Sequence, residues 1–310
     1  MARIQIETPG AIPMAKAIEL AFQSFGCEPL GGPSNDGWSK IADLQRCAYR
    51  YYLRHELQAT VGDGAAPGAL EVGSLYHASL ALHYCRQLPE GFPGWRPNPP
   101  PPMDFVERVG ELNADAAYVA EARRLLYGYL EHHSPDDLEP VAVEYGAGIE
   151  GIHTCRFDML AWRDGALWNV EHKTSAFESA QGNEAWWLDG EIIGEVYAWK
   201  LANLERLFGA PLAGVIINLA FKSKPPKYKR LDVVVPDKVL ETYARDRQFW
   251  SQQREHFRRA GHWPKSLWGC NARYDTCTYF EHCRDEDQSL LKVGLPPGFS
   301  SSSPSSSSDE

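Results

Sequence analysis

Long apolar runs are missing from this 310-residue chain, and no stretch approaches the roughly 20 consecutive apolar residues that cross a bilayer. The opening segment, MARIQIETPGAIPMAKAI, is too polar to form the apolar centre of a secretory signal. We therefore expect no membrane contact and a cytoplasmic protein.

Positive charge is also scarce. The chain has 31 Lys and Arg against 41 Asp and Glu, which gives a formal net charge of −10. This balance argues against nonspecific binding of nucleic acid, but binding depends on local charge. The segment FKSKPPKYKR, residues 221–230, collects Lys and Arg side chains. They could contact phosphates or protect a strand edge, and the sequence leaves both interpretations open.

Cysteine is limited to seven residues, an odd number that disfavours the disulfide framework of a secreted protein. Three of them, Cys270, Cys277 and Cys283, lie within fourteen residues near the C-terminus. Clustering of this kind is better suited to metal ligation in a reducing compartment than to disulfide formation.

Helical and strand-like patterns alternate along the rest of the chain. Helices are predicted at 38–57 with Ser39 as N-cap, and at 69–85, 111–133, 184–207 and 237–260. The Pro-rich segment 89–104 is predicted to be an extended loop. Strands are predicted at 140–149, 152–162, 166–174, 213–222 and 229–236, the first three as a β-meander. The pattern predicts an α/β fold.

Charge is concentrated where two predicted strands end. Asp158 lies near the end of one strand, and Glu171-His172-Lys173 ends the next. Because the two sites are about equally far from the connecting RDG turn, cross-strand pairing is permitted. Side chains alternate along a strand, so Glu171 and Lys173 share a face and His172 points the other way.

Two neighbouring carboxylates form a hard oxygen site for Mg²⁺ or Mn²⁺, to which the backbone carbonyl of His172 could add another oxygen. A lysine beside that site can orient water and offset charge on a phosphate. The alternative interpretation is an ordinary surface salt bridge between Lys173 and Glu171 or Asp158.

The motifs RFD and VEHKTS resemble those of the PD-(D/E)XK nuclease superfamily, specifically its RecB/AddB-like exonuclease branch with an iron–sulfur cluster, which has CRISPR-associated and phage-type relatives. GSLYH resembles the Gly-x-x-x-His motif of that branch, SKIADLQRCAYRYYL its first helix, and CNARYDTCTYFEHC its terminal cysteine triplet. The resemblance runs from about residue 38 to 284. It implies a restriction-endonuclease-like core, in which helices flank a mixed central β-sheet and a cysteine cluster joins the N- and C-terminal segments.

Carried onto this sequence, the resemblance implies that Asp158, Glu171 and His77 are metal ligands and that Lys173 is the catalytic lysine. An imidazole ligand suits Mn²⁺ better than Mg²⁺. Tyr197 matches the tyrosine of the family's Gln-x-x-x-Tyr motif and would join the catalytic set.

The glutamine of that motif is replaced by isoleucine at position 193. Glu191 or Glu195 could take its place, or could be ordinary solvated charge on a helix. The role of this predicted helix is therefore left open by the sequence.

The resemblance also implies that Cys47, Cys270, Cys277 and Cys283 hold a [4Fe–4S] cluster. A Cys₄ zinc site is the alternative, although one remote and three clustered cysteines do not fit the usual pairs of close cysteines. The gap between the first two clustered cysteines is longer than the family's. Such a cluster would tie the N-terminal helix to the C-terminal end of the chain, so that its loss destabilises the fold.

Taken together, these features predict a metal-dependent DNA exonuclease that hydrolyses phosphodiester bonds of single strands or DNA ends in recombination, repair or replication. The alternatives are a non-cleaving nucleic-acid-binding protein on the same fold and a zinc-stapled interaction protein. The predicted organisation is an N-terminal extension at 1–37, one nuclease domain at 38–294 and a disordered Ser-rich tail at 295–310. Within the domain we expect a helical part at 38–135, a catalytic core at 139–236, and a C-terminal helix with the cysteine cluster at 237–284.

Overall fold

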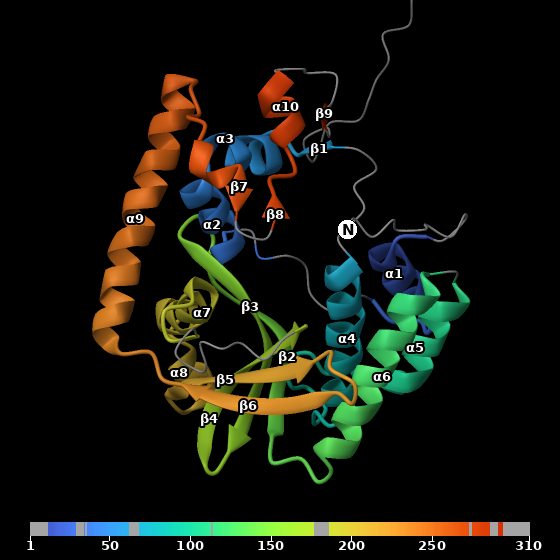
Figure 1. Ribbon diagram of the computed structural model, residues 1–310. Helices are drawn as coiled ribbons and strands as arrows, with labels where there is room; N and C mark the ends of the chain where they lie inside the picture. Colours follow the sequence, from blue (N-terminus) through green and yellow to red (C-terminus); the bar gives the residue numbers. More distant parts are fainter. Residues whose placement is uncertain are drawn as a thin grey trace, which may run out of the picture. The chain divides into compact units, whose positions relative to one another are not determined.

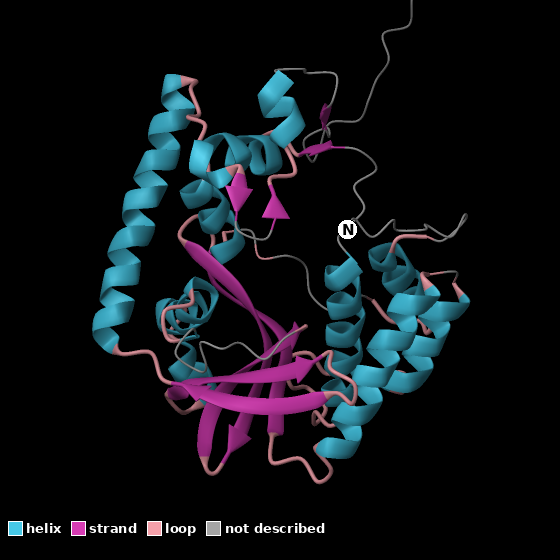
Figure 2. Ribbon diagram, in the orientation of Figure 1, coloured by secondary structure: helices cyan, strands magenta, loops and turns pink. Residues whose placement is uncertain are grey.

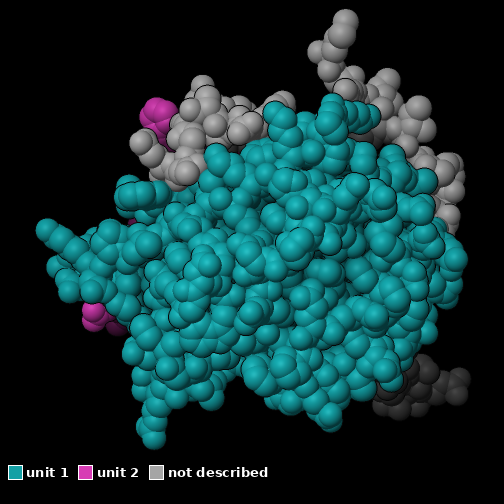
Figure 3. Space-filling view, turned by 90° about the horizontal axis from the view of Figure 1, so that it is seen from below, with its two compact units in different colours: residues 1–38, 66–246 teal, residues 39–65, 247–310 magenta. Residues whose placement is uncertain are grey.

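The computed structural model describes residues 12–28, 34, 36–61, 68–112, 114–176, 186–272, 275–285 and 291–293. The chain divides into two compact units that interleave in sequence (Figure 3). Unit 1 comprises residues 1–38 and 66–246, and unit 2 comprises residues 39–65 and 247–310. The predicted tail at 295–310 lies outside the described residues. The boundaries of a single 38–294 domain stay a prediction.

A five-stranded mixed sheet forms the centre of unit 1 (Figure 1). Its strands follow one another in space in chain order, β2 (Glu139–Ile149), β3 (His153–Arg163), β4 (Ala166–Ser175), β5 (Leu212–Phe221) and β6 (Lys227–Val233). Only β4 and β5 are parallel among these neighbours. The sequence prediction of a mixed α/β fold is confirmed.

A two-residue turn fixes the register of β3 and β4. Asp164 and Gly165 both have positive φ, 53° and 74°. This conformation is typical of tight hairpin turns, whose twist matches that of the strands they join. An Asp-Gly pair therefore sets which residues of β3 and β4 lie opposite one another.

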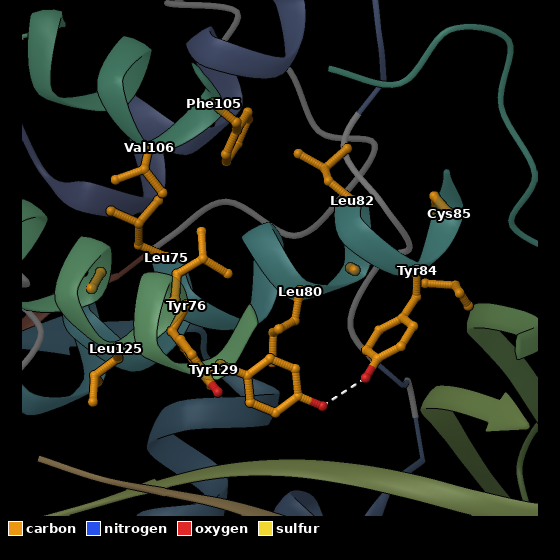
Figure 4. Packing of buried hydrophobic residues seen from close by; sticks show 14 of the residues in the cluster. Leu75, Tyr76, Leu80, Leu82, Tyr84, Cys85, Phe105, Val106, Leu125 and Tyr129 are labelled. Atoms are coloured by element: carbon orange, nitrogen blue, oxygen red, sulfur yellow. Dashed lines mark hydrogen bonds between the residues drawn. The ribbon is translucent and has the colours of Figure 1, made fainter. Parts of the chain in front are cut away.

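Helices cover both faces of this sheet (Figure 2). On one face pack α1 (Met14–Ser24), α4 (Gly68–Cys85), α5 (Pro102–Glu111) and α6 (Ala116–His132). Figure 4 shows part of this core, in which the hydroxyls of Tyr84 and Tyr129 are hydrogen-bonded at 2.6 Å. On the other face pack α7 (Gly190–Leu201) and α8 (Leu204–Phe208). Residues of α1, inside the predicted N-terminal extension, are thus part of the core of unit 1.

Unit 2 is built from two chain segments, residues 39–65 and 247–310. It contains most of α2 (Trp38–Arg46), α3 (Ala48–Tyr51), a π-helical turn (Tyr52–Glu56) and α10 (Phe280–Asp285). Short strand pairs complete it: β1 (Ala59–Val61) with β9 (Leu291–Val293), and β7 (Asn271–Ala272) with β8 (Asp275–Thr276). The boundary between the units falls inside α9 (Asp237–Ala260), whose limits match the predicted helix.

Two predicted helices and the predicted Pro-rich loop differ from the structure. The helix expected at 38–57 breaks at Cys47, which is extended (φ −166°, ψ 116°) and caps α3, and Ser39 is not its N-cap because α2 begins at Trp38. The Pro-rich loop ends early, because Pro102 starts α5, where a proline needs no N–H partner. The helix expected at 184–207 is α7 and α8, separated at Asn203, which has φ 51°.

No helix within the described part of the chain is long and apolar enough to span a membrane.

Candidate active site

Two carboxyl groups meet where β3 and β4 leave their common ladder. The final ladder pair at this end is Met159 with Val170, so the next residues outward are Asp158 and Glu171. The backbone N–H of His172 donates to Asp158 Oδ2 at 3.0 Å. The structure thus brings Asp158 to the strand segment that carries Glu171 and Lys173.

Lys173 lies between two carboxylates. Its Nζ is 2.7 Å from Glu171 Oε1 and 2.6 Å from Glu191 Oε2 on α7. Burial alone would lower the pKa of Lys173, but the two carboxylates outweigh burial and raise it. The ammonium therefore stays charged and is held on the same side of β4 as Glu171.

His77, which lies on α4 in the predicted motif GSLYH, contacts the Asp158 carboxyl group. Its Nδ1 lies 3.5 Å from Asp158 Oδ2. Burial lowers the pKa of His77 to about 4, against the opposing effect of Glu171. The imidazole is consequently neutral near pH 7, which is the form that can bind a metal ion.

A further acid, Glu144 on β2, joins this group and was not expected from the sequence. It has φ 52° in a strand and faces the Arg156 guanidinium, whose Nε lies 2.6 Å from Glu144 Oε2. Burial and then repulsion from Asp158 raise the pKa of Glu144. The available signal was an acid inside the apolar segment PVAVEYGAGI, the same signal that drew attention to Glu171.

The positive charges near Asp158 and Glu171 do not fully compensate the burial of their two carboxyl groups. Burial raises the pKa of both, and repulsion from Asp158 raises that of Glu171 further. Lys173 opposes these shifts without reversing them. Hard oxygen donors in mutual repulsion are the donor set that a divalent cation such as Mg²⁺ or Mn²⁺ fits.

Both candidate replacements for the missing glutamine face the site from α7. Glu191 contacts Lys173, and Glu195 is 4% exposed and accepts a hydrogen bond from Asn169 Nδ2 at 2.6 Å. Burial, followed by repulsion from Glu171 and Glu191, raises the pKa of Glu195 well above its usual value. The interpretation of Glu195 as solvated helix charge is therefore wrong.

Tyr197 lies farther along α7 and packs in a core cluster with Ile193 and Val196. Its ring centroid is 5.5 Å from that of His153 and 5.6 Å from that of Tyr243. These contacts are those of a packed aromatic side chain. A catalytic role for Tyr197 stays a prediction.

His172 points to the opposite face of β4 and is held there by a buried polar network. Its ring stacks on Tyr84, with centroids 5.8 Å apart and planes 8° apart, and its Nδ1 lies 2.9 Å from Asn218 Nδ2. The same amide donates to Tyr129 Oη at 2.7 Å. Because these partners fix the residue between Glu171 and Lys173, the network positions both of them.

Arg230 belongs to that buried network and is not part of a cationic surface. Its guanidinium donates to Asp136 Oδ1 at 2.7 Å and to Tyr129 Oη at 2.9 Å, and its side chain is 9% exposed. The hypothesis that Arg230 contacts phosphates, drawn from the segment FKSKPPKYKR, is therefore wrong.

The four cysteines assigned to a cluster all belong to unit 2. Cys47 Sγ accepts from the Ser266 N–H at 3.4 Å, and Cys270 Sγ donates to the Ser266 carbonyl at 3.6 Å. The Cys277 N–H donates to the Cys270 carbonyl at 2.9 Å. The pKa of the Cys283 thiol is raised to about 11, first by burial and in part by the other three thiols. Cys47 and Cys270, far apart in sequence, thus bond to the same residue, but the four thiols do not form a group close enough to hold a metal ion as placed.

Among the described residues, no three His, Cys, Asp or Glu side chains are close enough together to hold a metal ion unaided. Mg²⁺ usually keeps several waters and takes only one or two carboxylates from a protein. The acid pair of β3 and β4 does not need a third side chain to fit such an ion.

Comparison with known proteins identifies the family. The chain matches the PD-(D/E)XK nuclease superfamily over residues 38–284. The chain belongs to this superfamily. As a PD-(D/E)XK nuclease it acts on nucleic acid, and nucleases of this superfamily typically use Mg²⁺ or Mn²⁺. The matched region contains His77, Asp158, Glu171 and Lys173.

No curated protein matches the sequence of this PD-(D/E)XK nuclease. Among solved structures, it is similar to a crystal structure at 2.19 Å of a protein from Eubacterium rectale that is named as a candidate exonuclease. The two share 13% sequence identity, over 94% of this chain and 96% of the other, with a TM-score of 0.44.

Proposed function

We propose that this PD-(D/E)XK nuclease is a metal-dependent DNA exonuclease of the RecB/AddB-like branch, acting on single strands or DNA ends in recombination, repair or replication. The observation that carries the proposal is the meeting of Asp158, Glu171 and Lys173 at the ends of β3 and β4. The seven cysteines are free, which suits a reducing cytoplasm, bacterial or phage-infected.

In this proposal Asp158 and Glu171 hold the divalent ion, with His77 and the carbonyl of His172 as further donors. The ion, when bound, supplies Lewis-acid stabilisation of charge on the phosphate. Lys173 orients the attacking water and offsets charge on a phosphate oxygen, while Glu191 fixes the position of the ammonium. The water oxygen bonds to phosphorus, the bond from phosphorus to one bridging ester oxygen breaks, the water proton passes to solvent, and the leaving oxygen takes up a proton from solvent.

Cleavage of end-labelled single-stranded DNA tests this function. We expect Mn²⁺ to support hydrolysis and EDTA to abolish it, because the buried carboxyl groups of Asp158 and Glu171 act only through a bound cation. Parallel reactions on end-blocked and circular DNA distinguish attack at ends from internal attack. Absence of cleavage at high enzyme concentration with Mn²⁺ would favour the non-cleaving nucleic-acid-binding protein.

We further propose that Cys47, Cys270, Cys277 and Cys283 hold a [4Fe–4S] cluster, with Zn²⁺ as the alternative occupant. The support is that Cys47 and Cys270, from the two chain segments of unit 2, both bond to the backbone of Ser266. Four thiolates are the donors that either cofactor requires. Such a cluster would link α2 and α3 to the C-terminal segment of the same unit.

Replacing Cys283 with serine is expected to lower iron content and stability together. Loss of one thiolate weakens the cluster, and metal-binding free energy contributes directly to folding. A loss of about 2 kcal/mol would lower Tm by roughly 4–8 °C. Iron analysis and thermal unfolding of anaerobically purified protein measure both effects.

The matched control is Cys27→Ser, a thiol of unit 1 that lies outside the set. It should leave iron content and Tm unchanged. Unchanged iron in Cys283→Ser would remove this residue from the cluster. A colourless wild-type protein that contains zinc and no iron would assign the site to zinc.

A further inference from the structure

A tight turn immediately before α7 presents two apolar side chains to solvent. The Asp189 N–H donates to the Trp186 carbonyl at 3.3 Å, so Trp187 and Leu188 are the two central residues of the turn. Trp187 is 54% exposed and Leu188 is 77% exposed. Removal of apolar surface from water is favourable, so the turn offers apolar area that a ligand can cover.

The two tryptophans of this turn have different environments. Trp186 packs against the core cluster that contains Ile192 of α7. Trp199, farther along α7, contacts the rings of two phenylalanines, whereas among the described residues no aromatic ring packs on Trp187. Trp186 therefore holds the turn on the protein, and the indole of Trp187 is open to a ligand.

The turn is joined to the residues of the candidate active site. Asp189 caps α7, because its Oδ1 accepts from the Glu191 N–H at 2.9 Å. Glu191 in turn contacts the Lys173 ammonium at 2.6 Å. Gly190 lets this end of α7 lie close against Trp38, since a Cβ at Gly190 would overlap the Trp38 ring. These contacts fix the position of the turn relative to the lysine.

The open indole lies within reach of a strand bound at the active site. Trp187 and Glu191 are four residues apart, so their Cα atoms are separated by about 14 Å at most. Stacked nucleotides of one strand are spaced by roughly 3.4 Å, so this distance corresponds to about four nucleotides. A strand whose phosphodiester lies at Lys173 therefore brings its bases to Trp187.

The place of the turn favours nucleic acid over a protein as its occupant. The chain is a PD-(D/E)XK nuclease, so its substrate has to approach the residues around Lys173. The two acids beside the turn have donors of their own. Asp189 accepts from the N–H groups at the start of α7, and Glu191 is paired with Lys173.

We propose that Trp187 stacks on a base of the substrate strand close to the phosphodiester that is cleaved, with Leu188 against the same nucleotide. Every base has a π-face, so an aromatic ring binds a strand with little sequence preference. A base inside a duplex is covered on both sides by its neighbours, so this contact selects an unpaired strand or a DNA end. The inference rests on the proposed nuclease function and names a residue that holds its substrate beside the site.

Binding of a fluorescent oligothymidylate, followed by anisotropy in EDTA, tests this contact. Trp187→Ala should weaken binding about five- to hundred-fold, because loss of stacking on one base has an effect of this order. Trp187→Phe keeps an aromatic face and should recover most of the affinity. Because Trp187 is exposed at a turn, neither substitution removes core packing, and thermal unfolding of both variants should match that of the wild type.

A fully abasic strand of the same length distinguishes base stacking from any other contact. If Trp187 acts through a base, the wild type and Trp187→Ala should bind the abasic strand with equal affinity, because the effects of removing either partner of one contact are not additive. An equal loss in Trp187→Ala on the abasic strand and on oligothymidylate would contradict stacking.

Trp268→Ala is the matched control. Trp268 belongs to unit 2 and is 95% exposed, and its neighbour Leu267 is also exposed, so the control removes a second open tryptophan that lies beside a leucine. It should bind oligothymidylate as the wild type does. Equal losses in Trp268→Ala and Trp187→Ala would overturn the proposal. Wild-type binding by Trp187→Ala would also overturn it and would leave the turn as a surface for a protein partner.

Because binding is measured in EDTA, its outcome does not depend on cleavage. Failure of the nuclease proposal would appear instead as absence of Mn²⁺-dependent hydrolysis by the wild type. Duplex DNA with blunt ends should bind more weakly than the single strand, and tighter duplex binding would contradict the inference.

Discussion

Lys173→Met is expected to reduce DNA cleavage about 10²–10⁴-fold, the range found when a positioned proton-transfer or charge-stabilising group is removed. Methionine keeps much of the length of lysine but lacks the ammonium that lies between Glu171 and Glu191. Nothing then offsets charge on the phosphate or orients the water. The measurement is the single-turnover rate on labelled single-stranded DNA with saturating Mn²⁺.

Binding of Mn²⁺ should survive in Lys173→Met. The substitution removes a positive charge from beside Glu171, so attraction of a divalent cation to that carboxylate is retained or strengthened. Lys200→Met is the control, because Lys200 is an exposed lysine of α7 that pairs with Asp237. Normal cleavage by Lys173→Met would mean that the active site has been assigned to the wrong residues.

Along β4, the side chains proposed to act in the reaction lie on one face, and the side chain that supports them lies on the other. Asn169, Glu171 and Lys173 contact glutamates of α7, whereas His172 contacts Tyr84 and Asn218 on the other face. Period-two alternation requires this division, so the sequence was sufficient to predict which charged side chains share a face. The Asp-Gly turn was likewise sufficient to predict the hairpin that brings Asp158 beside them.

Features that depend on tertiary packing could not be predicted in this way. Glu144 reaches the acid group from a left-handed backbone conformation in β2, which local sequence does not indicate for a glutamate. Arg230 was grouped with surface lysines because its neighbours are lysines, but Asp136 and Tyr129 draw it into the interior. The break at Cys47 interrupts a continuous helical pattern, and its Sγ accepts from Ser266, more than two hundred residues away.

Asp158→Asn is expected to weaken Mn²⁺ binding by at least about 100-fold, since changes in the outer shell alone cost about 10–100-fold. Asparagine has nearly the same shape and can still accept the His172 N–H bond that Asp158 Oδ2 receives. It removes one of the two negative charges proposed to hold the ion. Cleavage should fall together with Mn²⁺ binding, whereas in Lys173→Met cleavage should fall while Mn²⁺ binding is retained.

The control for this substitution is Asp232→Asn. Asp232 lies on β6 of the same sheet, is half-exposed and pairs with Arg163 Nη2 at 2.6 Å. It should bind Mn²⁺ as the wild type does. Thermal unfolding of all variants establishes that each protein is folded.

Electron paramagnetic resonance of Mn²⁺ bound to the wild type, Asp158→Asn and Lys173→Met tests the central claim most directly. The account predicts tight binding by the wild type, retained binding by Lys173→Met and lost binding by Asp158→Asn. Equal binding of Mn²⁺ by Asp158→Asn and the wild type would contradict it, because the ion would then be held by residues other than the β3–β4 acid pair.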